Sequence, residues 1–346
     1  MAEPLLYRHI VIKDIRLSLL SLLQRTLSTE RGPNGAPVGA WTRKITVTVL
    51  PLRSSDLIVG YRRGLRDVIL LCPNLESFCI GGWLESPYSC PEVTEDIFKA
   101  LPGHLRMCAW ANHRENVQLR RFRDSCSFFS MLEHLRLRNI SGNRYEQLIL
   151  TFPKLRSLSF ASWISGYCID QWVLPSLVWL EISVENAAWL EGLGSFFFEH
   201  GKKLEFLQFV PGLYPISYIE IPLNFFQYFP LLSCFSVDPS WMQLGTIEES
   251  DKIPAVPYKN LTTLHILRLE PRCGPHNSCS EFVRLFFVAH QNLFPRLKVI
   301  SFTIKGEYVV VPMFYPWFCS GVRPTREELA KLGDEFCFDL IDHAYL

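Results

Sequence analysis

Apolar residues recur along the chain in a six-residue pattern, L-x-x-L-x-L, in which aromatic and β-branched residues also fill the apolar positions. Successive copies start between 22 residues (Leu155 to Leu177) and 36 residues (Leu261 to Leu297) apart. Such self-similarity predicts a repeat architecture, in which each copy is one structural unit stacked on the next. The copies start at nine leading leucines, namely Leu75, Leu105, Leu132, Leu155, Leu177, Leu204, Leu232, Leu261 and Leu297.

Each copy predicts a short strand. Its last two apolar positions lie two residues apart, so their side chains share one face of an extended segment, and the first position closes the turn that leads into it. Segments with helical spacing lie between copies, for example 91–100 and 187–200. The period is near the roughly 20–29 residues of leucine-rich repeats. The sequence therefore predicts an α/β fold, an irregular leucine-rich-repeat solenoid (horseshoe) with an inner parallel sheet and outer helices.

Three regions follow from the extent of the repeats. Residues 1–40 are expected to form an N-terminal helical segment and loop, with Asp14 as the helix cap. Residues 41–305 form the solenoid of about nine degenerate repeats, and residues 306–346, which include Phe336 and Ile341, cap the end of its core. No asparagine stands eight residues after any leading leucine. Backbone groups there must find other partners, so we expect variable curvature.

Composition limits the class of protein. Hydrophobic residues make up 48% of the 346 residues and charged residues 20%, so the chain can bury a large core. A net charge of +1 gives no overall field for nucleic acid or an anionic membrane, and no apolar run reaches the ~18 residues of a membrane span. We expect a monomer that binds neither. The odd count of 11 cysteines is typical of free thiols, which favours a cytoplasmic or nuclear location.

The sequence contains no recognisable catalytic signature. Glycine-rich phosphate loops, H-E-x-x-H, G-x-S-x-G and C-x-x-C are all missing. Cys273, His276 and Cys279 could offer zinc three ligands, but no second ligand pair stands at a fitting distance. We predict no metal, no cofactor and no enzymatic activity. One alternative is an enzyme with a cryptic pocket that uses His134, His265 or this Cys/His group, and another is a free-standing structural repeat protein.

The strand residues between the buried ones point to the opposite face of the sheet. Trp179 and Phe206, on neighbouring strands, combine with nearby charges in the way typical of protein interfaces. The alternative is that a loop or the C-terminal segment covers this face and buries both aromatic rings. We predict a partner-binding surface made by His134, Arg136, Arg138, Trp179, Glu181, Phe206, Gln208, Asp238 and His265.

The N-terminal region carries a resemblance to a known family. Residues 1–12 contain Pro4-Leu-Leu-Tyr7, and a leucine-rich helical segment, a loop at 31–40 and a strand at 44–49 follow before the repeats begin. This order resembles the region just downstream of the F-box in fungal F-box/leucine-rich-repeat proteins. The resemblance implies that the repeats hold a target protein for a cullin-RING ubiquitin ligase. Because the F-box itself is absent from this sequence, we expect the chain to bind an unidentified target but not the ligase adaptor.

Overall fold

The computed structural model divides the chain into two compact units, Met1–Leu177 (unit 1) and Val178–Leu346 (unit 2). The structure describes residues 7–13, 16–32, 35–48, 55–82, 91–112, 117–125, 129–137, 140–141, 149–161, 169–184, 193–211, 219–221, 223–237, 242–244, 257–266, 293–297, 299–304 and 307–312.

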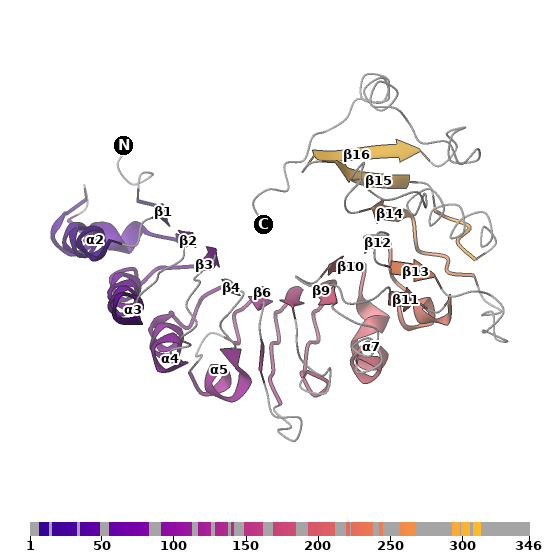
Figure 1. Ribbon diagram of the computed structural model, residues 1–346, viewed down its shortest axis with the longest axis horizontal. Helices are drawn as coiled ribbons and strands as arrows, with labels where there is room; N and C mark the ends of the chain where they lie inside the picture. The colour runs from indigo at the N-terminus through magenta and orange to yellow at the C-terminus, as the bar shows by residue number, and fades with distance from the viewer. Residues whose placement is uncertain are drawn as a thin grey trace. The chain divides into compact units, whose positions relative to one another are not determined.

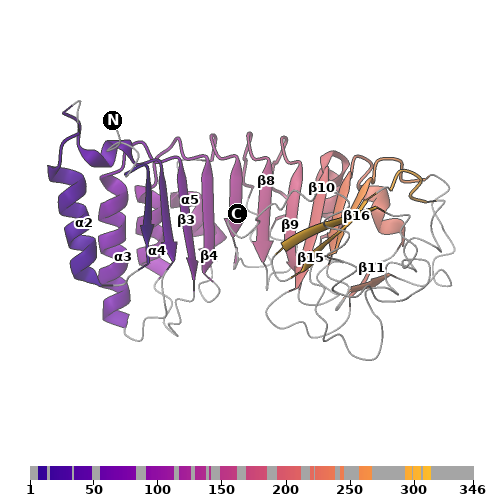
Figure 2. The same ribbon diagram turned by 90° about the horizontal axis from the view of Figure 1, so that it is seen from above.

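Unit 1 is a parallel sheet with helices along one face. Its strands, in spatial order, are β1 (His9–Ile12), β2 (Lys44–Thr48), β3 (Ser77–Gly82), β4 (Met107–Asn112), β6 (His134–Leu137) and β8 (Ser157–Ala161). The helices are α2 (Leu17–Thr29), η1 (Val38–Trp41), α3 (Ser55–Leu70), α4 (Pro91–Ala100) and α5 (Leu119–Ser125). Helices α2, α3, α4 and α5 contact one another in sequence order and lie in a row beside the sheet (Figures 1 and 2). Two short parallel strands, β5 (Val117–Gln118) and β7 (Ile140–Ser141), form a separate pair.

Unit 2 continues the same alternation of strand and connection. Five parallel strands are followed by one antiparallel strand: β9 (Trp179–Val184), β10 (Phe206–Pro211), β12 (Cys234–Val237), β14 (Thr263–Ile266), β15 (Val299–Ile304) and, antiparallel to β15, β16 (Glu307–Pro312). The helical segments are α7 (Gly194–His200), η3 (Gly201–Lys203) and η4 (Leu223–Tyr228), and β11 (Ile219–Ile221) pairs with β13 (Met242–Leu244).

Burial confirms the repeat register. All nine leading leucines are buried, and none is more than 5% exposed. The fourth and sixth positions of the pattern are buried wherever the structure describes their side chains, as at Phe78 and Ile80 in β3. Where both positions are described, a strand therefore places two apolar residues on the core side of the sheet, while the leading leucine fills the turn before it. The α/β class and the parallel repeat sheet are confirmed by this arrangement.

The turn before each strand explains why proline precedes many of the leading leucines by two residues. In the segment Cys72–Leu75, the Leu75 N–H donates to the Cys72 carbonyl at 3.1 Å, and Pro73 is the second residue of this four-residue turn. Proline suits that position because its ring fixes φ near the value the turn needs. The same bond closes the turns at Leu155, Leu177, Leu232 and Leu297.

Two parallel strands of unit 1, β1 and β2, lie outside the nine repeats, although a strand at 44–49 is expected from the sequence and β2 confirms it. Strand β2 follows the spacing from Thr42 through Ile45 to Val47, and β1 follows it from Tyr7 through Ile10 to Ile12. Thr42 is fully buried in the leading position. Neither strand matches the leucine pattern, because threonine in β2 and tyrosine in β1 replace the leading leucine.

Some expected boundaries differ from the structure. The helix α2 begins after Arg16, whose side chain makes no capping bond, whereas the sequence suggests Asp14, which lies outside the described residues. Helix α7 begins at Gly194, later than the expected 187–200. The expected C-terminal cap falls almost wholly outside the described residues, which end at Pro312.

Aromatic side chains fill the space between sheet and helices. In unit 1 the Phe98 ring centroid lies 4.9 Å from that of Trp110 and 5.0 Å from that of Phe122. In unit 2, Phe196 and Phe197 are buried, whereas Phe198 is 62% exposed. Phe196 and Phe197 therefore belong to the core of unit 2, and Phe198 does not. Such rings stabilise the core through the apolar area that they bury and through edge-to-face contacts with one another.

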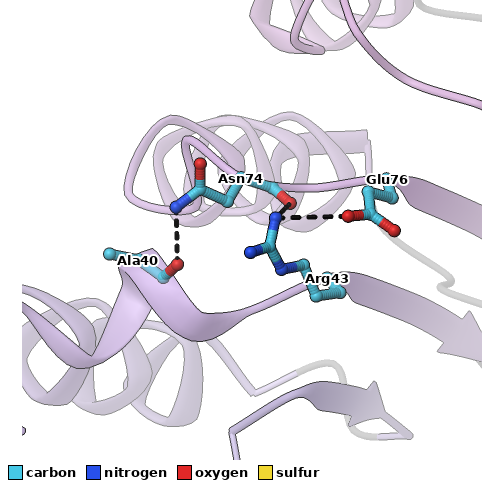
Figure 3. Close-up of polar contacts among 4 residues, drawn as sticks. All are labelled: Ala40, Arg43, Asn74 and Glu76. Carbon is cyan, nitrogen blue, oxygen red and sulfur yellow. Dashed lines mark hydrogen bonds and ion pairs between the residues drawn. The ribbon is translucent and has the colours of Figure 1, made fainter.

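Side chains just before the leading leucines tie successive turns together. Asn74 donates from Nδ2 to the Ala40 carbonyl at 2.7 Å, as Figure 3 shows. Asn260 bonds the Pro230 carbonyl in the same way at 2.7 Å. The Ser176 hydroxyl donates to the Pro153 carbonyl at 2.7 Å. These bonds satisfy backbone oxygens of the preceding turn. Turns before the strands thus gain hydrogen-bond partners, although no asparagine stands eight residues after any leading leucine.

Replacing Asn74 by alanine is expected to lower the free energy of unfolding by about 1–2 kcal/mol, because the half-buried turn then loses a hydrogen bond to the Ala40 carbonyl. His104 occupies the same position in the next repeat and is exposed, so His104→Ala should change stability by less than ~0.5 kcal/mol. Urea titrations followed by circular dichroism compare the two variants. Equal losses would contradict the assigned role of Asn74.

Candidate functional site

The outward face of unit 1, opposite its helices, is formed by two columns of residues that run across the six strands. The first column is His9, Lys44, Ser77, Met107, His134 and Ser157, and the second is Val11, Thr46, Cys79, Ala109, Arg136 and Ser159. Neither column contains an aspartate or a glutamate. The titratable groups of the two columns are therefore basic, apart from the Cys79 thiol. Burial raises the pKa of this thiol, so it stays uncharged at neutral pH.

Two histidines on this face have lowered pKa values. Burial, and after it the charge of Lys44, lowers the pKa of His9, whose Nε2 lies 2.9 Å from Thr46 Oγ1. Partial burial also lowers the pKa of His134, which keeps part of its ring exposed; Glu133 opposes this shift, and neighbouring arginines add to it. Both imidazoles are therefore mostly neutral at pH 7. The positive charge of the two columns then rests on Lys44 and Arg136.

A row of charged residues borders these columns where the strands begin. We call it the strand-start row, and it consists of Arg8, Arg43, Glu76, Arg106, Glu133 and Arg156, each directly before a strand. Their backbones form a continuous ladder, in which each residue's N–H donates to the carbonyl of the row's previous member. The row therefore has fixed spacing of about 4.8 Å per strand.

Ion pairs neutralise the middle of the strand-start row. Arg43 Nη1 lies 3.2 Å from Glu76 Oε1 and also donates to the Asn74 carbonyl (Figure 3). Arg106 Nη2 lies 2.6 Å from Glu133 Oε1. Because these side chains are well exposed, each pair is worth no more than about 1 kcal/mol. The row of four arginines and two glutamates keeps a charge of 4 − 2 = +2.

The pattern of apolar positions alone does not reveal this row. The signal for it was present, because the residues directly after successive leading leucines alternate in charge, as Glu76, Arg106, Glu133 and Arg156. Side chains at one position of consecutive repeats become neighbours in a parallel sheet, and alternating signs then favour pairing.

The outward face of unit 2 carries an aromatic pair. Trp179 in β9 and Phe206 in β10 are partners in the strand register. Their ring centroids lie 5.3 Å apart with an angle of 10° between the ring planes, so the rings are stacked. Both side chains are half-buried. Strand pairing thus holds a rigid, flat apolar surface on the face predicted to bind a partner.

The second column of this face changes from accessible to buried along the unit. Glu181 and Gln208, beside the aromatic pair, are half-buried. Farther along, Ser236 is fully buried and His265 is only 8% exposed. His265 therefore offers a partner little surface. Among the described residues, the accessible part of the second column therefore lies on β9 and β10.

The structure distributes the residues of the predicted surface between the two units. His134 is exposed and Arg136 half-buried on the outward face of unit 1. Arg138 and Asp238 lie outside the described residues. The remaining predicted residues all belong to the outward face of unit 2, namely Trp179, Glu181, Phe206, Gln208 and His265.

Groups suited to metal or catalytic chemistry are scattered in the described part of the chain. No cluster of three His, Cys, Asp or Glu residues that could hold a metal occurs there; Cys273, His276 and Cys279 lie outside it. A cavity of about 590 Å³ is lined by residues of α2 and α3, including Gln24, Arg25 and Asp67. His134 and His265 lie on separate strands, β6 and β14. The described helices include none long and apolar enough to cross a membrane.

Comparison with known proteins gives little. No family model and no curated protein matches the chain. Among solved structures, the chain is similar to one described as the crystal structure of the Rad7 and Elc1 complex in yeast, with 14% sequence identity and a TM-score of 0.35. That match covers 76% of this chain and 71% of the other chain. Similarity at this level carries no argument, so the repeat geometry is the basis for what the chain is expected to do.

Proposed function

We propose that this chain is a non-enzymatic protein-interaction module, resembling the target-recognition part of an F-box/leucine-rich-repeat protein, and that a partner protein binds on the outward face of its sheet. The observation that carries the proposal is the stack of Trp179 on Phe206. Large, rigid aromatic side chains that remain partly accessible are the residues that most often dominate binding energy at protein interfaces. A repeat sheet presents such groups at fixed intervals along an extended surface.

The neighbours of the stack support this role. Glu181 and Gln208 follow Trp179 and Phe206 two residues along the same strands, so polar groups border the apolar centre. An apolar centre with a polar rim is the usual composition of a specific protein interface. The proposal includes a leucine-rich-repeat horseshoe whose inner sheet faces the partner, as in the family that the chain resembles.

The test compares proteins captured by the full chain and by variants from cell extract. Trp179→Ala and Phe206→Ala are each expected to weaken binding of a specific partner about thirtyfold or more, since truncating a central aromatic costs roughly 2 kcal/mol or more. Phe198→Ala is the matched control, because Phe198 is 62% exposed on α7. A partner must be retained by the control and lost by both stack variants. If every captured protein is retained equally by all variants that keep wild-type circular dichroism, the proposal is wrong.

A further inference from the structure

The charges of unit 1 indicate what kind of partner segment its outward face accepts. Within the described part of unit 1, the two outward columns hold basic groups and no carboxylate, and the strand-start row beside them adds a charge of +2. The two carboxylates of the strand-start row, Glu76 and Glu133, already pair with Arg43 and Arg106. This positive charge is local, because the whole chain has a net charge of only +1.

The cations lie along a path that an extended peptide could follow. Arg8 precedes the first strand of the sheet of unit 1 and Arg156 precedes β8, the last strand of that unit. Five steps of about 4.8 Å separate them, or roughly 24 Å, which about seven extended residues can span. Lys44 lies on β2, next to Arg43 of the row, and is half-buried. An acidic segment laid across the strands would meet these groups in turn.

We propose that the outward face of unit 1, with its strand-start row, binds an acidic segment of the protein partner. This inference rests on the proposed function and adds the charge of the segment that is bound. Charge complementarity of this kind mainly sets which partner is chosen and how fast it associates. Binding should therefore weaken as salt screens the exposed cations.

A defined peptide tests the inference on the full chain. The probe is a fluorescein-labelled octapeptide of alternating glutamate and serine, and its control has glutamine for every glutamate. Fluorescence anisotropy should show binding of the acidic peptide that weakens when salt rises from about 50 to 300 mM, because the Debye length shortens. The glutamine peptide should bind at least roughly tenfold more weakly, as expected for the loss of several charge contacts.

Matched variants locate the binding. The double variant Lys44→Gln/Arg156→Gln removes two accessible cations of this face and should weaken peptide binding about fivefold or more, through the loss of two partly exposed charge contacts. Arg25→Gln/Arg63→Gln removes the same charge from exposed positions on α2 and α3 and should change binding less than about twofold, since those groups would make no contact. Equal weakening by both doubles would show a general charge effect and overturn the inference.

Two further outcomes separate this inference from the proposed function. If the acidic peptide does not bind while Trp179→Ala still loses a specific partner, the acidic-segment inference fails and the interaction module stands. Single-stranded RNA of eight nucleotides that binds more tightly than the peptide would also overturn the inference, because a phosphate backbone would then be the better match. Peptide binding that is lost only in Lys44→Gln/Arg156→Gln supports it.

Discussion

Replacing Leu158 by alanine is expected to lower the free energy of unfolding by about 2–5 kcal/mol, the range for truncating a buried leucine when the cavity cannot close. Leu158 is fully buried at the fourth position of its repeat, as the second residue of β8, and its register partner is Leu135. The cavity left by truncation of its side chain could not close, because the backbone hydrogen bonds of the sheet hold the neighbouring strands in place.

Ser157 provides the control for this prediction. It is the preceding residue of the same strand, half-buried on the outward face, and Ser157→Ala should change stability by less than ~0.5 kcal/mol. Urea titrations followed by far-ultraviolet circular dichroism measure both variants. If Ser157→Ala cost as much as Leu158→Ala, the assignment of buried and outward positions in the repeat would be wrong, and with it the location of the binding face.

Replacing Gly201 by alanine is expected to destabilise unit 2 by about 1–3 kcal/mol, through overpacking rather than through backbone strain. A methyl group at Gly201 would lie 2.5 Å from the Tyr228 carbonyl oxygen and 3.1 Å from the Phe229 ring. Gly201 stands three residues before its leading leucine, and its carbonyl accepts the bond from Leu204 that closes the turn. Because the contact is with backbone of the next repeat, no side-chain rotation can relieve it.

The glycine at the other end of the same helix serves as the comparison. Gly194 is the first residue of α7, and a methyl group there would have no heavy atom within 4 Å. Gly194→Ala should therefore leave stability unchanged or raise it by up to about 1 kcal/mol, because alanine loses less backbone entropy on folding. Thermal melting of the two variants separates the effects. A harmless Gly201→Ala would show that successive turns do not pack as closely as described.

The repeat pattern predicts the fold class well because it depends on strong, local physics. An apolar residue at every leading, fourth and sixth position has no favourable place except the core, so nine leucines fix the register of nine strands. Proline, which stands two residues before many of the leading leucines, favours the turn that leads into the strand. The strand at 44–48 is predicted, but the units led by Tyr7 and Thr42 are harder to recognise as repeats, because burial of Thr42 depends on the repeat packed against it and not on its own hydrophobicity.

The candidate site is only partly predictable from the sequence. Alternation places Trp179 and Phe206 on the outward face, and the register then brings the two rings into a stack. Alternation alone gives no warning that His265 is buried, because the exposure of an outward residue depends on segments distant in sequence. The charged strand-start row is readable only when equal positions of successive repeats are compared, as at Glu133 and Arg156.

The central claim, that a partner protein binds on the outward face of the sheet, is tested most directly by photo-crosslinking. The photoreactive amino acid p-benzoylphenylalanine would replace Phe206 on that face or Phe198 on α7, two phenylalanines of the same unit. A specific partner should crosslink through position 206 and not through position 198, and it should do so in the full chain under native conditions. Crosslinking of the same partner only through position 198 would place the interface on the helical side and contradict the claim.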